Sequence, residues 1–438
     1  MKRNKIGKHL VRVFETPSSE YSEWFGYYNY DPLSSDHTKL LCGRSSVDGV
    51  APSKGMTIEL GYYDIPSGIW HKIGESDSWN WQQGAMLQWL PAEGGETSVV
   101  YNASRNNRLV SVIYDINTGE EKEIDWPVYG ITPDGRKSIS LDLERSYWCR
   151  AYHYQSVVNT EKEGRIYGDD GIFEIDLTRN TRKRILSIQS IVECDASPDF
   201  SSKKHWLEHV MISPSGKRIC FLHRFSSMDN VMDYGTRLCI ADADGGNLQV
   251  IPGWDRFVWS HFGWNDDDSF SIYTVEDSLG KGLRGIKELL RTRPFPLSQL
   301  VKRIFYSSSV RLPYPLNRIL TGRLCCYQYY SLDNDGRFSL SDRFIDRYLS
   351  IDGHPSFIHG KDVMLTDSYP DRNGYQRLLL YDIHKDRVTM LGEFYAALRN
   401  TPASCDLHPK LSGEGFVTVD TAYDGRHHMI VFRIANAL

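Results

Sequence analysis

The amino-acid sequence predicts an all-β fold, a seven-bladed β-propeller, and two repeated patterns carry this prediction. The first pattern is a short strand that ends in Asp, followed by a turn and a second strand. Alternating runs joined by turn residues are typical of β-hairpins. The pattern occurs in YDIPSGIWHKI, YDINTGEEKEI, IDLTRNTRKRIL, ADADGGNLQVI and YDIHKDRVTML, at Asp64, Asp115, Asp176, Asp242 and Asp382.

The spacing of these aspartates gives the number of units. The successive spacings are 51, 61, 66 and 140 residues, and the last corresponds to two units with one copy obscured, which we expect around 338–351. A seventh unit ends in HHMIVFRIANAL without its own last strand, and the N-terminal LVRVFET is expected to supply it. Closing a ring in this way leaves few strand edges exposed. Deleting the residues before Glu15 is therefore expected to lower the melting temperature greatly.

The second pattern is a histidine near the start of a unit, as in HVMISPSGKRICFLHR, GHPSFIHGKDVMLTDS and DLHPKLSGEGFVTVDT, with a looser copy in HFGWNDDDSFSIYTV. The first strand of each blade lines the central channel of a propeller, and its first residues lie at one mouth. Histidines at the same place in several units are thus expected to meet there. The expected starts of the seven units are Trp24, Trp81, Val128, His209, His261, His354 and His408.

Converging imidazoles are candidate metal ligands, because neutral imidazole suits Mn²⁺, Zn²⁺ and similar ions. We therefore predict a divalent metal, Mn or Zn, held by His209, His261, His354 and His408. Catalytic roles are also assigned to His209 and His408. The alternative is that a histidine at a strand start only forms hydrogen bonds with neighbouring backbone. For His261 the evidence for this alternative is at least as strong as the evidence for metal binding. Gln83, in WNWQQGAMLQW, is expected to face the same mouth as a substrate ligand.

Arg224 follows the second strand of the fourth unit. Its guanidinium is a candidate catalytic group that neutralises a substrate carboxylate, and pairing with a nearby acidic residue is the alternative. Trp81 is a candidate for stacking on sugar rings, against the alternative of packing between blades. Tyr369 and Arg426 are weaker substrate-binding candidates, each beside an aspartate that follows a strand. Those aspartates, Asp367 and Asp420, are more typical of turns than of catalysis.

The bulk composition points to a globular protein of the cytoplasm. The chain has 438 residues, 40% hydrophobic and 12% aromatic, with a net charge of −5, which argues against nucleic acid as a partner. The basic N-terminus lacks the apolar core of a signal peptide, and no window reaches the length of a spanning helix. The eight cysteines lack the spacing of a metal site.

One segment is foreign to the repeat, an insertion over residues 277–323 within the single propeller domain of 1–438. Between Lys281 and Arg323 it holds ten basic residues against Glu288 alone. IKELLRT and LSQLVKRIF have the apolar spacing of short amphipathic helices. Such stretches bind anionic membrane surfaces or polyanionic glycans, and the alternative is a face whose charges are simply solvated.

The Asp hairpins, the PSG and PDG turns and the HP-x-x-S-x-x-G frame at His408 resemble TolB-like propellers, and more narrowly the oligogalacturonate-lyase type of seven-bladed propeller. The resemblance covers nearly the whole chain apart from the insertion. It implies a cytoplasmic enzyme that cleaves acidic oligosaccharides by β-elimination, with a divalent metal held by His and Gln near the channel mouth. The sequence departs from the pattern of this family in one respect: it has no compact Gln-His-His cluster late in the chain.

Three hypotheses about function follow. The first is a carbohydrate-active enzyme, a metal-assisted lyase for uronic-acid-containing oligo- or polysaccharide. In this hypothesis the metal or Arg224 stabilises the developing negative charge at the carboxylate, while a histidine takes the proton alpha to it. The second is a non-catalytic propeller scaffold. The third is a component of polysaccharide synthesis, peripheral to the membrane through residues 281–323. Metal content separates the first from the second, and binding to anionic vesicles tests the third.

Overall fold

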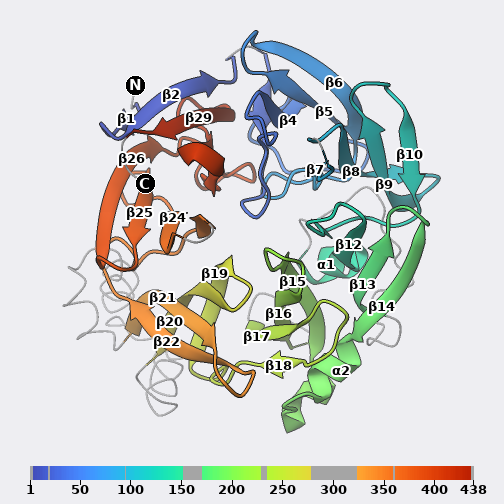
Figure 1. The fold of residues 1–438 in the computed structure, drawn as a ribbon, viewed down its shortest axis with the longest axis vertical. Helices are drawn as coiled ribbons and strands as arrows, with labels where there is room; N and C mark the ends of the chain where they lie inside the picture. The colour runs from blue at the N-terminus through green and yellow to red at the C-terminus, as the bar shows by residue number, and fades with distance from the viewer. Residues whose placement is uncertain are drawn as a thin grey trace, which may run out of the picture.

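Seven antiparallel sheets follow one another around a central axis, which confirms the predicted seven-bladed β-propeller (Figure 1). The computed structural model describes residues 3–17, 20–93, 95–150, 170–227, 234–277, 323–358 and 361–435. Apart from the two N-terminal strands, β1 and β2, the strands of each sheet lie in sequence order from the centre of the ring toward its rim. Without these two strands, each sheet is therefore one contiguous unit of the chain.

The first four sheets are built from β3 to β18. The first sheet contains β3 (Ser22–Trp24), β4 (Lys39–Ser45), β5 (Ile58–Asp64) and β6 (Ile69–Ser76). The second contains β7 (Gln88–Leu90), β8 (Ser98–Arg105), β9 (Arg108–Asp115) and β10 (Glu121–Ile124). The third contains β11 (Gly130–Ile131), β12 (Lys137–Leu141), β13 (Gly171–Asp176) and β14 (Thr181–Ser187). The fourth contains β15 (Lys204–Ile212), β16 (Arg218–Ser226), β17 (Tyr234–Asp242) and β18 (Gln249–Val250).

The last three sheets include both N-terminal strands. The fifth contains β19 (Phe257–Asp266), β20 (Ser269–Asp277), β21 (Arg323–Leu332) and β22 (Phe338–Phe344). The sixth contains β23 (Ser356–Ile358), β24 (Val363–Asp367), β25 (Tyr375–Asp382), β26 (Arg387–Tyr395) and, at its rim, β1 (Lys5–Ile6). The seventh contains β27 (Lys410–Leu411), β28 (Phe416–Thr421), β29 (His428–Ile434) and β2 (Leu10–Glu15).

The N-terminal strand β2 pairs antiparallel with β29, from Leu10 opposite Ile434 to Glu15 opposite Ile430. The preceding strand, β1, pairs with β26 of the neighbouring sheet. The first residues of the chain thus lie against two of the last sheets, as Figure 1 shows near the N label. How much this pairing contributes to the stability of the ring stays a prediction.

Each predicted Asp hairpin joins the third and fourth strands of its sheet. The aspartate ends the third strand and caps the turn, as where the Asp115 carboxylate accepts hydrogen bonds from the backbone N–H of Asn117 and Thr118, both at 2.9 Å. The obscured copy lies earlier than we expected. Its third strand is β21, and Asp333 caps the turn after it, so 338–351 begins with the outer strand β22.

The inner strands are covered on both faces, because each sheet packs between two others. In β16 every residue from Ile219 to Ser226 is buried. The helices are short: α1 (Leu143–Arg150), α2 (Ile188–Glu193) and the 3₁₀ turns η2 (Pro198–Ser202) and η3 (Gly413–Gly415).

Most of the predicted basic insertion, residues 278–322, lies outside the described residues. Its helices, and its part in the predicted domain organisation, therefore stay predictions. In the part of the chain that the structure describes, no helix is both long enough and apolar enough to cross a membrane.

Candidate metal and ligand cavity

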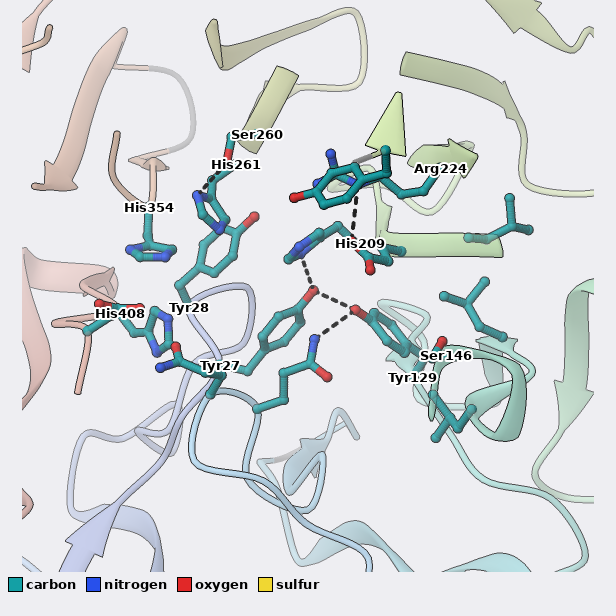
Figure 2. Close-up of a pocket in the computed structure, with 18 of the residues that line it drawn as sticks. Tyr27, Tyr28, Tyr129, Ser146, His209, Arg224, Ser260, His261, His354 and His408 are labelled. Carbon is teal, nitrogen blue, oxygen red and sulfur yellow. Dashed lines mark hydrogen bonds and ion pairs between the residues drawn. The ribbon is translucent and has the colours of Figure 1, made fainter. Parts of the chain in front are cut away.

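A cavity of about 300 Å³ draws its wall from all seven sheets or the segments that lead into them (Figure 2). This volume is at the lower end of the range for small-molecule sites. The four histidines that the repeat pattern predicted to meet all line it: His209, His261, His354 and His408.

Local backbone irregularities aim these histidines. The pairing register of β15 with β16 shifts at His209, and that of β19 with β20 shifts at His261. A β-bulge bends a strand and re-aims the side chain at that point. His209 and His408 also have left-handed backbone, with φ of 53° and 42°. Residues other than glycine rarely adopt this conformation, and such outliers cluster at functional sites.

His354, Asp406 and His408 bring their ligand atoms within 4.8 Å of one another. The ring centroids of the two histidines are 4.4 Å apart. Asp406 precedes His408 by two residues in the segment CDLHP. Sequence reasoning missed Asp406, although an Asp two residues before a candidate ligand was a signal that could have identified it. Two imidazoles and a carboxylate are typical metal ligands, and they leave coordination positions open for a substrate.

The candidate metal group holds two of the four predicted histidine ligands, and the metal-binding roles of His209 and His261 stay predictions. His209 and His261 line the same cavity but lie outside the group whose ligand atoms converge. The bulges that aim them bring His261 close to the ring of His354, at 4.2 Å between centroids, while His209 lies 5.4 Å beyond His261. In the described part of the chain the candidate metal group is His354, Asp406 and His408.

Two further carboxylates contact the histidines from behind. Asp367 accepts hydrogen bonds from the backbone N–H of His354 at 2.7 Å and from its Nδ1 at 2.9 Å. Asp352 lies 3.2 Å from Nδ1 of His261. A histidine that binds a metal usually gives its other ring N–H to such a carboxylate. The contacts of Asp367 thus suit His354 to metal binding, and they differ from the turn-forming role that its sequence position suggested.

Burial and these neighbours shift the ionisation of the site. Burial, and then the charge of Asp367, raises the pKa of Asp406 to about 7, and burial raises that of Asp367 to about 6. Burial and a neighbouring imidazole hold the pKa of His354 and His408 well below the usual range. For His261, burial opposes the charged form, but Asp352 and nearby carboxylates outweigh it and raise the pKa. The candidate metal group therefore offers neutral imidazoles, the form that binds metals.

A tyrosine ring lies in the middle of the four histidines. The centroid of Tyr28 is 5.0 Å from that of His354 and between 5.8 and 6.5 Å from those of the other three. Its hydroxyl donates to the carbonyl of Phe262 at 3.2 Å. Asp420 fixes the segment that carries Tyr28, because its carboxylate accepts from the N–H groups of Phe25 and Gly26. Sequence reasoning missed this segment, FGYYNY, because it lies outside the repeated patterns.

Tyr27 connects His209 to the second and third sheets. Its hydroxyl lies 3.3 Å from Nδ1 of His209 and 2.8 Å from the hydroxyl of Tyr129. Gln83 in turn donates to the Tyr129 hydroxyl at 3.3 Å (Figure 2). Gln83 and Tyr369 both line the cavity, as expected from the sequence. Their roles as substrate ligands stay predictions.

Arg224 also lines the cavity, and a buried ion pair orients it. Its Nε donates to Glu208 at 3.1 Å, and Glu208 accepts a second bond from Trp206 at 2.8 Å. One terminal nitrogen, Nη1, donates to Thr236 and to the carbonyl of Trp259. Arg224 is only 4% exposed, so its pairing with an acidic residue is confirmed and its guanidinium is also held at the cavity wall.

Two predicted substrate ligands lie elsewhere. Trp81 is 3% exposed, packs against Trp24 at 4.4 Å and His427 at 4.6 Å between ring centroids, and donates to the carbonyl of Val50. A ring covered in this way cannot stack on a sugar, so the alternative of packing is correct. Arg426 is not among the cavity-lining residues; its guanidinium pairs with Asp48 at 3.3 Å. Trp81 therefore takes the packing alternative, and Arg426 has an acidic partner away from this cavity.

No family of known proteins matches the sequence, and no curated protein matches it. Solved structures do match the fold. An oligogalacturonate lyase in complex with manganese superposes with a TM-score of 0.61 at 14% identity, over 99% of this chain and 96% of that one. TolB from Acinetobacter baumannii matches at a TM-score of 0.36 and 14% identity, over 90% and 80%. An α-L-arabinanase of Penicillium chrysogenum matches at 0.40 and 9%, over the whole of both chains.

The similarity to oligogalacturonate lyase supports, at the level of fold, the resemblance that the sequence motifs indicated. At this level of identity it shows the fold alone, a seven-bladed β-propeller. It carries no activity over by itself, because one fold hosts many functions.

Proposed function

We propose that this protein is a metal-dependent carbohydrate-active enzyme, a lyase that cleaves uronic-acid-containing oligo- or polysaccharide by β-elimination. The observation that carries the proposal is the meeting of His354, Asp406 and His408 with Arg224 in one cavity. A metal group and an oriented guanidinium are the two cationic elements that a reacting uronate requires. The similar fold of a manganese-bound oligogalacturonate lyase supports the same proposal.

The metal would be held by His354, Asp406 and His408, with Mn²⁺ or Zn²⁺ as the candidate ions. When bound, it would act as a Lewis acid that stabilises negative charge on the substrate carboxylate. The protein's part is to keep the imidazoles neutral and buried. Burial does this for His354 and His408, because it disfavours their charged forms and lowers their pKa.

Arg224 would bind the substrate carboxylate. Its Nε donates to Glu208 and its Nη1 donates to Thr236. Among the described residues, the other terminal nitrogen, Nη2, is therefore the donor left for a ligand at the cavity wall. This nitrogen belongs to a permanently charged guanidinium, so it can donate a charge-assisted hydrogen bond to a carboxylate oxygen. Negative charge that develops on the carboxylate as the alpha proton leaves would be stabilised here.

His209 and His261 would move the protons of the elimination. Their rings are 5.4 Å apart on the cavity wall. His209 would take the proton alpha to the carboxylate, as the C–O bond beta to that carboxylate breaks. Asp352 favours the protonated form of His261, which would then protonate the leaving oxygen. His408, which the sequence also suggested as catalytic, would serve the metal instead, because it lies with Asp406 and His354.

The test is an assay of the full chain, stripped of metal and reloaded with Mn²⁺ or Zn²⁺, on a series of oligouronates. The expected result is metal-dependent growth of the ultraviolet absorbance of an unsaturated uronate product. Arg224→Lys should lower kcat/KM by about 100-fold or more, as loss of a transition-state donor does. Arg426→Lys is the matched control, because Arg426 pairs with Asp48 outside the cavity. Absence of product and of metal binding would favour the scaffold hypothesis instead.

The partner and the location form a second part of the proposal. The acidic glycan would be the ligand of the cavity, and the basic segment 281–323 would add affinity for an anionic membrane surface or for the same glycan. The site of action would then be the cytoplasm, at the periphery of the membrane. The test compares the full chain with a variant in which a Gly-Ser linker replaces this segment, on anionic vesicles and acidic polysaccharide at low salt. Equal binding by both proteins would contradict it.

A further inference from the structure

Asp367 has a buried carboxylate that contacts the imidazole ring of His354. It ends β24 and is 1% exposed, and in the described residues its carboxylate accepts hydrogen bonds from His354. Oδ1 accepts the backbone N–H at 2.7 Å, and Nδ1 of the ring lies 2.9 Å from Oδ1 and 3.1 Å from Oδ2. The backbone and the ring of one residue are thus held by one carboxylate.

The chemistry of this contact decides which ring nitrogen of His354 carries the proton. An ionised carboxylate only accepts hydrogen bonds, so the nitrogen that faces it, Nδ1, must be the donor. In a neutral imidazole the other nitrogen, Nε2, then keeps a lone pair. A metal needs this lone pair, and His354 shares the candidate metal group with Asp406 and His408.

The backbone around His354 is built for this contact. A side chain at Gly353 would collide with the carbonyl oxygen of Asp367, so only glycine allows the segment to approach β24 so closely. The pyrrolidine of Pro355 follows directly and restricts the backbone of His354. The Gly-His-Pro sequence thus positions the ring against Asp367.

We propose that Asp367 is the positioning residue of the metal group: it fixes His354 as the Nδ1–H tautomer and directs Nε2 to the metal. The inference deepens the proposed function and rests on it for the role of the metal. The tautomer itself can be measured in the metal-free protein. The two parts can therefore fail separately.

The seventh sheet offers a matched control in Asp420. This residue lies near the end of β28, the second strand of its sheet, as Asp367 does in β24. It is 4% exposed and accepts two backbone N–H groups, from Phe25 and Gly26. It contacts no imidazole in the described residues. Loss of either carboxylate leaves buried N–H groups unsatisfied, but only Asp367 bonds a ring of the metal group.

The experiment compares Asp367→Leu with Asp420→Leu, because leucine has a similar volume and accepts no hydrogen bond. Protein labelled with ¹⁵N-histidine is studied without metal, and a His354→Gln variant assigns the ring signals. We expect wild type and Asp420→Leu to show Nδ1–H at His354, and Asp367→Leu to show Nε2–H. The Kd for Mn²⁺, from calorimetry, should rise about 10–100-fold in Asp367→Leu, the range for lost partners of metal ligands. Asp420→Leu is the control for the tautomer alone, because Asp420 also fixes the segment that carries Tyr28.

Asp367→Asn keeps the test sharp if the leucine variant does not fold. Its amide oxygen can still accept from His354, but it carries no charge, so the tautomer should persist while the Kd rises by about tenfold. The inference is overturned if Asp367→Leu retains Nδ1–H, or if Asp367→Leu binds Mn²⁺ as tightly as wild type. Where wild type binds no Mn²⁺, the proposed function fails, and the tautomer of His354 alone decides the inference.

Discussion

Two groups of histidines differ in their surroundings, one in the cavity and one within the fourth sheet. In the cavity, His261 faces the carboxylate of Asp352 and His354 faces that of Asp367. The second group, which we call the sealed chain, consists of His205, His223 and Arg237, all fully buried. Nε2 of His205 lies 2.8 Å from the carbonyl of Phe200, its Nδ1 lies 2.8 Å from Nε2 of His223, and Nδ1 of His223 lies 3.3 Å from Arg237.

The ends of the sealed chain determine its protonation. Arg237 only donates and a carbonyl only accepts, so each histidine must accept on one nitrogen and donate from the other. Both are therefore neutral. Burial, and then nearby cationic groups, lowers the pKa of His205 to about 4 and that of His223 well below its usual value. The groups next to an imidazole, more than the imidazole itself, therefore distinguish a candidate metal site from a structural element.

The largest expected effect is the loss of Arg237. Its terminal nitrogens donate to the carbonyls of Ile191, Cys194 and Asp195, which close the segment between the third and fourth sheets. Arg237→Met would leave these carbonyls and His223 unsatisfied. Two or more charge-assisted bonds are lost, so urea denaturation should show a fall of about 4 kcal/mol in the free energy of unfolding. Arg426→Met is the control, since its side chain is 33% exposed and pairs with Asp48, and an equal fall there would contradict a special role for the sealed chain.

The second prediction concerns the cavity. His408→Ala removes one of three candidate ligands and should raise the Kd for Mn²⁺ by more than about 100-fold, beyond the effect of an outer partner. Calorimetry on the metal-free protein measures this. His205→Gln, in the sealed chain, should leave the Kd unchanged even where it lowers stability. Equal loss of affinity in both variants would contradict the division between the two groups.

The sequence allowed the architecture to be predicted because a propeller repeats it. The Asp hairpins fixed the number of sheets, and a shared position in the repeat was enough to bring four histidines to one cavity. The position of a residue in the repeat determines where in the propeller it lies. The meeting of the four histidines could therefore be predicted without knowledge of side-chain packing. The outer strand β2 was expected for the same reason, from a unit that lacked its own last strand.

The rest of the site could not be predicted, because it depends on segments between the repeats and on which face a side chain takes. Tyr28 enters from a connection without a periodic signal. Trp81 was misplaced because it lies in the turn between β6 and β7, where the alternation of faces along a strand does not apply. Glu208 was missed since its partner Arg224 comes from a neighbouring strand, and Asp406 was missed although it lies two residues before His408.

The third prediction uses pH to separate the two groups. The folded-state pKa of His205, about 4, lies below its ordinary value of 6.5. Its contribution to stability is therefore complete above pH 6.5 and is lost as the pH falls toward 4. Between pH 7 and 5 this loss is about 2 kcal/mol. Urea denaturation across this range should show the decline in wild type and a flatter curve in His205→Gln. Parallel curves would show that other groups control acid stability.

The last predicted effect has the opposite sign and belongs to Asp406. Its folded-state pKa, about 7, lies above the ordinary value of 3.8, so the folded state holds this proton more tightly than the unfolded state does. Without metal, its contribution is complete below pH 3.8 and is lost as the pH rises through 7. Asp406→Asn keeps the shape and removes the charge. At pH 8 the metal-free variant should therefore denature at a higher urea concentration than wild type, although its affinity for Mn²⁺ falls. The gain is limited because the amide also gives up its attraction to the protonated form of His261. The same comparison at pH 4 serves as the control, since Asp406 is then protonated in the folded wild type and the two proteins should denature together. A variant less stable than wild type at pH 8 would show that the carboxylate stabilises the empty site, and the contrast with the sealed chain would not hold.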